Sequence, residues 1–180
     1  IESQVLNVSE VYPLSLYALS SQIELHGRLR DLFLANYALE LLDLSGVIEF
    51  KTEEGDHLIS PCFVEVSKPD GNKNLLVDGI HRFLLAKKLN IPTVRSVVVS
   101  GVPDHFPLVP TPVDWNDVKI FDEVPPLTEK RHFRFSKLEG FPDISKFSDI
   151  KVSENNFRYF FYRDYGPLGS SGIRDSGKKS

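Results

Sequence analysis

The chain has no methionine and a single cysteine, Cys62, among its 180 residues. One cysteine cannot form an internal disulfide bond, so a disulfide-stabilised fold is excluded. We expect Cys62 to be a small buried apolar side chain within a strand. Methionine is missing at position 1 as well, so we expect the native start to be missing from this sequence.

Long apolar runs and an excess of basic charge are also missing. No run reaches the ~18 residues that span a bilayer, and no signal peptide is visible. We therefore expect a cytoplasmic protein with no membrane partner. The 21 Lys and Arg residues against 25 Asp and Glu residues give a net charge of −4. This balance lacks the overall basic character of many nucleic-acid-binding proteins, so we expect no specific binding to duplex DNA.

Alternating helical and strand patterns over the first hundred residues predict an α/β fold, with a small mixed sheet flanked by helices. Hydrophobic residues make up 41% of the chain, which is enough for one core without disulfides or metal. The polar segment Lys51–His57 is expected to be a loop. The expected strands are Gln4–Val8, Cys62–Ser67, Asn74–Val77 and Thr93–Val99, and the expected helical segments are Ser21–Ala35, Tyr37–Ser45 and Ile80–Leu89.

The composition changes after residue 100. Closely spaced prolines argue against a regular helix in most of the segment from Val102 to Pro126, and Trp115 is expected to anchor this segment against the core. Alternating and aromatic residues predict strands within 130–135 and 157–162. We therefore divide the chain into a core (1–100), a Pro-rich, strand-containing C-terminal extension packed on it (101–165), and a disordered tail rich in Gly, Ser, Lys and Asp (166–180).

The strongest functional motif begins where the strand ending at Val77 turns into the next helix. Asp78 and Gly79 make the turn, and His81 and Arg82 lie in the first turn of the helix. The amides of Gly79, Ile80 and His81 and the positive end of the helix dipole predict a phosphate site. Arg82 would bind phosphate oxygens in a bidentate manner, and His81 would donate a hydrogen bond. Asp78 would hold Mg²⁺ directly or through water.

Each part of this motif also has a purely structural explanation. Asp-Gly after a strand is a common turn in proteins without a bound phosphate. His81 could cap its own helix, and Arg82 could pair with a surface carboxylate. The coincidence of the four features favours the phosphate site.

The run Val77-Asp78-Gly79-Ile80-His81-Arg82, with its flanking strands and helix, resembles the signature of the ParB/sulfiredoxin superfamily. Members place a Gly-x-His-Arg or Gly-x-Arg-Arg turn after a strand and use it to hold nucleotide phosphates. The resemblance covers roughly residues 1–100 and is specific over 75–99. It implies a ParB/sulfiredoxin-like fold that binds ATP or ADP, or alternatively CTP, together with Mg²⁺.

The superfamily holds several activities. Sulfiredoxins carry a cysteine where this chain has Ile80, so their chemistry is not expected. Chromosome-partition ParB proteins carry a helix-turn-helix module downstream, which the Pro-rich segment here does not match. The Asp-Gly-x-His-Arg turn is similar to that of the free serine kinases, and it implies a phosphotransferase acting on a small hydroxylated metabolite, with Asp78 and His81 as catalytic residues. A regulator that binds a nucleotide or another phosphorylated ligand is the alternative, and a ParB-like nuclease or DNA-associated protein is the second alternative.

Further candidates lie outside the turn. His26 and Arg30 are four residues apart on one helical face, with Arg28 nearby, and could bind the remaining phosphates or an acidic substrate. A solvated helix face is the alternative explanation for these three residues. His105 follows the last core strand and could line the site or lie in a plain loop.

The resemblance to free serine kinases also implies a carboxylate that acts as general base, near the first strand or helix. Glu10 and Glu24 are the candidates in this part of the chain. No cluster of His and Cys has the spacing of a zinc site, and neither a Walker A loop nor a Rossmann glycine pattern is present.

Overall fold

A five-stranded mixed sheet forms the centre of the computed structural model, which describes residues 1–53, 55–101, 108–110, 112–125 and 133–135. β1 pairs with β8 and β6 with β7 in antiparallel fashion, whereas β8 with β6 and β7 with β2 are parallel. This confirms the predicted small mixed sheet. In spatial order the strands are β1 (Glu2–Asn7), β8 (Thr93–Val99), β6 (Cys62–Ser67), β7 (Lys73–Asp78) and β2 (Val11–Pro13).

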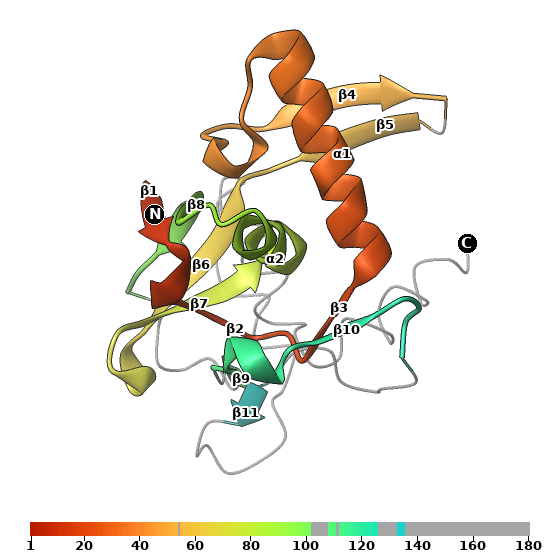
Figure 1. Ribbon diagram of the computed structural model, residues 1–180. Helices are drawn as coiled ribbons and strands as arrows, with labels where there is room; N and C mark the ends of the chain where they lie inside the picture. The colour runs from red at the N-terminus through yellow and green to blue at the C-terminus, as the bar shows by residue number, and fades with distance from the viewer. Residues whose placement is uncertain (54, 102–107, 111, 126–132, 136–180) are drawn as a thin grey trace, which may run out of the picture.

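Two α-helices in the described ranges accompany the sheet. α2 (Ile80–Lys88) lies against one face of the sheet, and the longer α1 (Ser20–Tyr37) packs against α2 (Figure 1). The short 3-10 helices are η1 (Val8–Glu10), η2 (Leu41–Asp43), η3 (Lys68–Asp70) and η4 (Trp115–Asp117). No helix in the described ranges combines the length and apolar character needed to cross a membrane.

Side chains on both faces of the sheet are buried. Successive residues of a strand point to opposite faces, and β7 shows this clearly. Leu76 joins a cluster with Phe83 of α2, whereas Leu75 and Val77 join a second cluster that includes Phe63. Phe83 is completely buried, and burying such a side chain contributes about 1.5–3 kcal/mol. This packing fixes α2 directly above the end of β7.

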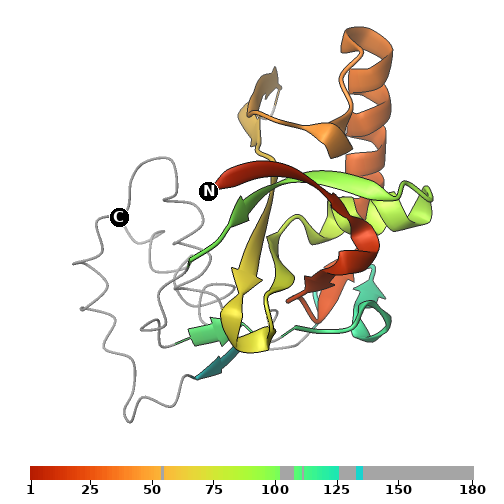
Figure 2. The ribbon, with the colours of Figure 1, turned by 90° about the vertical axis from the view of Figure 1, so that its left-hand side faces the viewer.

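Three further strand pairs among the described residues lie outside this sheet. β4 (Ile48–Thr52) and β5 (Gly55–Ile59) form an antiparallel hairpin that lies beside α1 and away from the main sheet (Figures 1 and 2). β3 (Tyr17–Leu19) pairs in parallel with β10 (Lys119–Phe121), and β9 (Leu108–Pro110) pairs with β11 (Phe133–Phe135).

The β4–β5 hairpin corrects the prediction of a loop over Lys51–His57. Ile48 and Phe50 are half-buried, whereas Glu49 and Lys51 are exposed, which is the period-two pattern of a strand. Phe50 packs edge-on against Phe33 of α1, with ring centroids 5.8 Å apart. The hairpin therefore depends on a contact with a distant helix.

A helix over Tyr37–Ser45 was predicted, and the structure shows that this is wrong. α1 ends at Tyr37 because Ala38 adopts a left-handed conformation with φ 51°. The segment then forms only the 3-10 helix η2, whose first turn is capped by the Glu40 side chain. Leu41 and Leu42 are both buried from within this short turn.

Only part of the apolar surface of α1 is buried. Ile23 and Phe33 are buried, but Leu29 is only half-buried and Leu32 is 51% exposed. Leu25 is also exposed, so two leucines of α1 face solvent.

Trp115 anchors the described part of the Pro-rich segment, as predicted. Its indole Nε1 donates a hydrogen bond to the backbone oxygen of Val11 at 2.7 Å, and its ring stacks on Phe83. The amide of Val113 donates to the oxygen of Pro13. The predicted strand over 157–162 and the predicted tail over 166–180 lie outside the described residues.

Candidate functional site

The junction between β7 and α2 is the centre of the candidate site. Gly79 is the N-cap residue of α2, with φ 110° and ψ 18°, and its carbonyl accepts the amide of Phe83 at 3.0 Å. A glycine N-cap offers no side-chain acceptor to the first amides of the helix. These amides and the helix dipole are therefore suited to an external anion.

A polar cavity of about 170 Å³ opens at this junction. Four parts of the chain form its wall: the end of β7 with the first turn of α2, the middle of α1, the end of β5 with the residue that follows it, and the loop after β2. α1, α2 and the β4–β5 hairpin converge in this region (Figure 1). The cavity is lined by Ser15, His26, Leu58, Ile59, Ser60, Leu76, Val77, Asp78, Gly79, Ile80, His81 and Arg82.

His81 is held by the strand that precedes α1. The amide of Leu19 donates a hydrogen bond to Nε2 of His81 at 3.2 Å. Nε2 must therefore be unprotonated, and in the neutral ring the proton lies on Nδ1. In this tautomer Nδ1 is the ring atom able to donate a hydrogen bond, the role that the sequence suggested for His81.

Arg82 is almost completely buried, with 5% of its surface exposed. Its Nη1 donates to the backbone oxygen of Ser60 at 2.5 Å, which ties α2 to the segment leaving β5. The ion pairs among the described residues involve Arg30, Lys51 and Arg95, not Arg82. The alternative pairing of Arg82 with a surface carboxylate is thus not seen in this part of the chain.

Asp78 is the last residue of β7, half-buried, and its side chain lines the same cavity. Within the described ranges, no group of three His, Cys, Asp or Glu residues could hold a metal ion. Mg²⁺, however, is commonly bound by one or two carboxylates together with substrate phosphates. The single carboxylate among the described residues that line the cavity therefore suits Mg²⁺ that is bound together with phosphates better than a resident metal.

His26 reaches the cavity from α1. Its Nδ1 lies 2.7 Å from the backbone oxygen of Gln22, one helical turn earlier, and its ring stacks on His81 with centroids 6.0 Å apart. Burial lowers the pKa of His26 below its ordinary value of 6.5. The Gln22 hydrogen bond and Asp78 raise this pKa, while the positive charge of Arg82 lowers it further. The net effect favours the neutral ring near pH 7.

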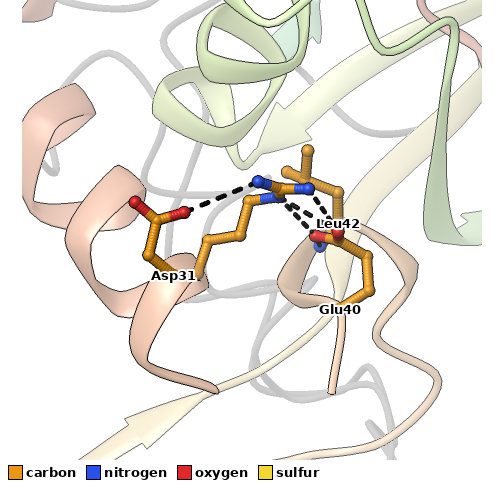
Figure 3. Close-up of polar contacts among 4 residues, drawn as sticks. Asp31, Glu40 and Leu42 are labelled. Atoms are coloured by element: carbon orange, nitrogen blue, oxygen red, sulfur yellow. Dashed lines mark hydrogen bonds and ion pairs between the residues drawn. The ribbon is translucent and has the colours of Figure 1, made fainter. Parts of the chain in front are cut away.

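Arg30 lies elsewhere, although it is one helical turn from His26. Its guanidinium forms a bidentate pair with Glu40, with Nη2 2.7 Å from Oε2, and it lies 3.6 Å from Asp31 (Figure 3). Glu40 also accepts the amide of Leu42. Arg30 therefore connects α1 to η2 and is absent from the residues that line the cavity.

The remaining candidates are not brought together with the turn. Glu24 and Arg28 are exposed on α1, and neither lines the cavity. Glu10 is exposed and accepts a hydrogen bond from Asn7. His105 lies outside the described residues.

Sequence reasoning missed one wall of the cavity. Leu58 and Ile59 are the last residues of β5, Ser60 follows this strand, and Ser15 lies in the loop after β2. The alternating pattern around Ile48 and Phe50 could have revealed the hairpin, but no local signal places its exit beside the α2 N-terminus.

Comparisons with solved structures return free serine kinases and a conserved hypothetical protein. A mutant free serine kinase in complex with ADP is 16% identical, with a TM-score of 0.37 over 61% of this chain and 36% of that chain. A conserved hypothetical protein from Pyrococcus furiosus is 18% identical, with a TM-score of 0.34 over 61% and 37%. The chain thus spans little more than a third of the length of these structures. No curated protein matches the chain.

A protein-family model gives the broadest match. The ParB CE domain model matches residues 1–119 of the 180, a range that includes every residue lining the cavity. The match confirms the ParB-like character that the Asp-Gly-x-His-Arg turn suggested. The chain therefore belongs to the ParB CE domain family.

Proposed function

We propose that the chain binds a nucleotide through its phosphates in the cavity at the start of α2. The observation that carries this proposal is the buried Arg82, which lines the cavity and forms no ion pair among the described residues. A buried positive charge is costly unless it is paired. A phosphate group would supply the missing negative charge, and the α2 amides and Nδ1 of His81 would supply further donors.

Calorimetric titration with ATP, ADP and CTP in the presence of Mg²⁺ tests the proposal. Arg82→Lys keeps the charge but loses the planar fork, and Arg82→Ala loses both. Each hydrogen bond to a charged group contributes roughly 1.5–3 kcal/mol, so affinity in Arg82→Ala should fall at least about tenfold. Arg28→Ala, on the exposed face of α1, is the matched control. Unchanged affinity in a folded Arg82→Ala protein would overturn the proposal.

The proposed activity is transfer of a phosphoryl group to a small hydroxylated metabolite. Asp78 supports it, because a carboxylate beside bound phosphates can position Mg²⁺, and phosphoryl transfer depends mainly on positioning and charge neutralisation. Asp78→Asn should then reduce turnover much more than nucleotide affinity. The assay is incubation with ATP or ADP, Mg²⁺ and a panel of hydroxylated metabolites that includes free serine, followed by mass spectrometry of the products.

Two other functions make different predictions. A regulator would bind the nucleotide with normal affinity and yield no phosphorylated product from any acceptor. A nuclease or DNA-associated protein would show saturable, steeply salt-dependent binding to duplex DNA below micromolar concentration in a gel-shift titration. The net charge of −4 argues against the second result.

A cytoplasmic location remains a prediction.

A further inference from the structure

We infer that Nε2 of His26 is the general base that accepts the proton of the acceptor hydroxyl. The inference rests on the proposed phosphoryl transfer and names the group that this reaction still needs. It departs from the expectation that a carboxylate, Glu10 or Glu24, has this role.

The position of His26 is the first argument. α1 carries its ring into the wall of the cavity that Asp78, Gly79 and Arg82 also line. The ring stacks on His81 at a centroid distance of 6.0 Å and an interplanar angle of 18°. His26 is therefore next to the residue expected to bind phosphate, which is where an acceptor hydroxyl must approach the transferred group.

The tautomer is the second argument. The backbone oxygen of Gln22 can only accept a hydrogen bond, so the proton of the neutral His26 ring lies on Nδ1, 2.7 Å away. Nε2 then carries the lone pair, which is what a general base requires. A carbonyl that fixes the tautomer and the ring orientation is the arrangement in which histidine commonly acts on a proton.

The charges around the ring are the third argument. Three groups that can carry charge share the cavity with His26, namely Asp78, His81 and Arg82. Burial lowers the pKa of His26, Arg82 lowers it further, and Asp78 opposes both. The ring is therefore mostly neutral at pH 7 and ready to accept a proton.

The competing carboxylates are the fourth argument. Among the described residues, Asp78 is the single Asp or Glu that lines the cavity, and its place on the phosphate turn suits Mg²⁺. Glu24 is exposed, two residues from His26 on α1, where consecutive positions point in different directions. Neither Glu10 nor Glu24 is positioned to receive the hydroxyl proton.

The step balances without another reactant. The hydroxyl oxygen forms a bond to the terminal phosphorus as the bond from that phosphorus to the bridging oxygen breaks. The bridging oxygen keeps the electron pair and leaves as part of the shortened nucleotide. The hydroxyl proton passes to Nε2 of His26, and the imidazolium later releases it to solvent.

The test compares His26→Gln with the wild-type chain, using ATP, Mg²⁺ and the acceptor that the product screen identifies. The turnover number should fall by about 100-fold or more, the usual contribution of general-base catalysis, while the dissociation constant for ATP changes less than threefold. The wild-type turnover number should decline only as the pH falls below 6.5 toward the lowered pKa of His26, and His26→Gln should lose this dependence. His57→Gln is the matched control, since His57 stacks on Phe50 in the hairpin and does not line the cavity.

The possible outcomes distinguish a failure of the proposed function from a failure of the role of His26. If the wild-type chain does not bind ATP, the proposed function is contradicted. Normal binding and turnover within threefold of wild type in His26→Gln overturn the role of His26 and leave the transferase intact. Normal binding with no product from any acceptor overturns both transfer and the general base. Nitrogen NMR gives a separate check, because a proton on Nε2 of the neutral His26 ring would also overturn the inference.

Discussion

Gly79 and Cys62 are in such close contact that no side chain fits between them. A Cβ atom on Gly79 would overlap Sγ of Cys62 and lie 2.9 Å from its Cβ atom. Gly79 also has a φ of 110°, a conformation that residues with side chains rarely adopt. The turn at Gly79 therefore requires glycine for two independent reasons, the backbone conformation and the strand beneath it.

Gly79→Ala should reduce both stability and nucleotide binding. Overpacking against a buried strand and the strained φ together should cost about 2 kcal/mol or more. Urea denaturation measures this loss, and calorimetry measures the binding. Gly46→Ala is the control, because Gly46 has no neighbouring atom within 4 Å of an added Cβ. Equal stability of the two variants would contradict the close contact.

Cys62 should be unreactive in the folded protein. It is 1% exposed, and burial raises the pKa of its thiol from 9.0 to about 11, with Asp78 adding to the shift and Arg82 opposing it. Because the thiolate is the reactive form, iodoacetamide at pH 8 should label Cys62 only when the chain unfolds. Mass spectrometry with and without urea measures the labelling. Rapid labelling without urea would show that the strand beneath Gly79 is accessible.

His26 should make the protein less stable at mildly acidic pH. Its pKa is lower in the folded state than the ordinary value of 6.5, so the unfolded chain binds the proton more readily. The stabilisation is complete above pH 6.5 and is lost as the pH falls toward the folded-state pKa. Urea denaturation between pH 5 and pH 7.5 should show a shallower pH dependence for His26→Gln. An identical pH dependence in both proteins would refute this expectation.

The Arg30–Glu40 pair should stabilise the fold without affecting nucleotide binding. The two side chains are 19% and 30% exposed, whereas Asp31, the other partner of Arg30, is 80% exposed. Glu40→Gln should therefore lower the free energy of unfolding by about 1 kcal/mol, and Asp31→Asn by no more than a few tenths. ATP affinity should stay within twofold in both variants. A tenfold loss of affinity in Glu40→Gln would instead link this pair to the site.

The amino-acid sequence by itself determined the centre of the candidate site. An apolar strand, a glycine turn and an amphipathic helix follow one another within 75–89, and each is specified by residues adjacent in the chain. Local patterns of this kind depend on backbone geometry and short-range periodicity. For the same reason the strands Cys62–Ser67 and Thr93–Val99 have the bounds that the sequence predicted.

Tertiary structure decided which other residues reach this turn. His26 and Arg30 occupy one helical face in the sequence pattern, yet only His26 lines the cavity, because Glu40 holds Arg30 away from it. The β4–β5 hairpin forms where its sequence is mostly polar, since Phe50 packs against α1. The chain that leaves β5 places the backbone oxygen of Ser60 within hydrogen-bond distance of the Arg82 guanidinium. Each of these features depends on a contact between segments that are distant in sequence. Such contacts form only when the chain folds, so the local sequence pattern does not predict them.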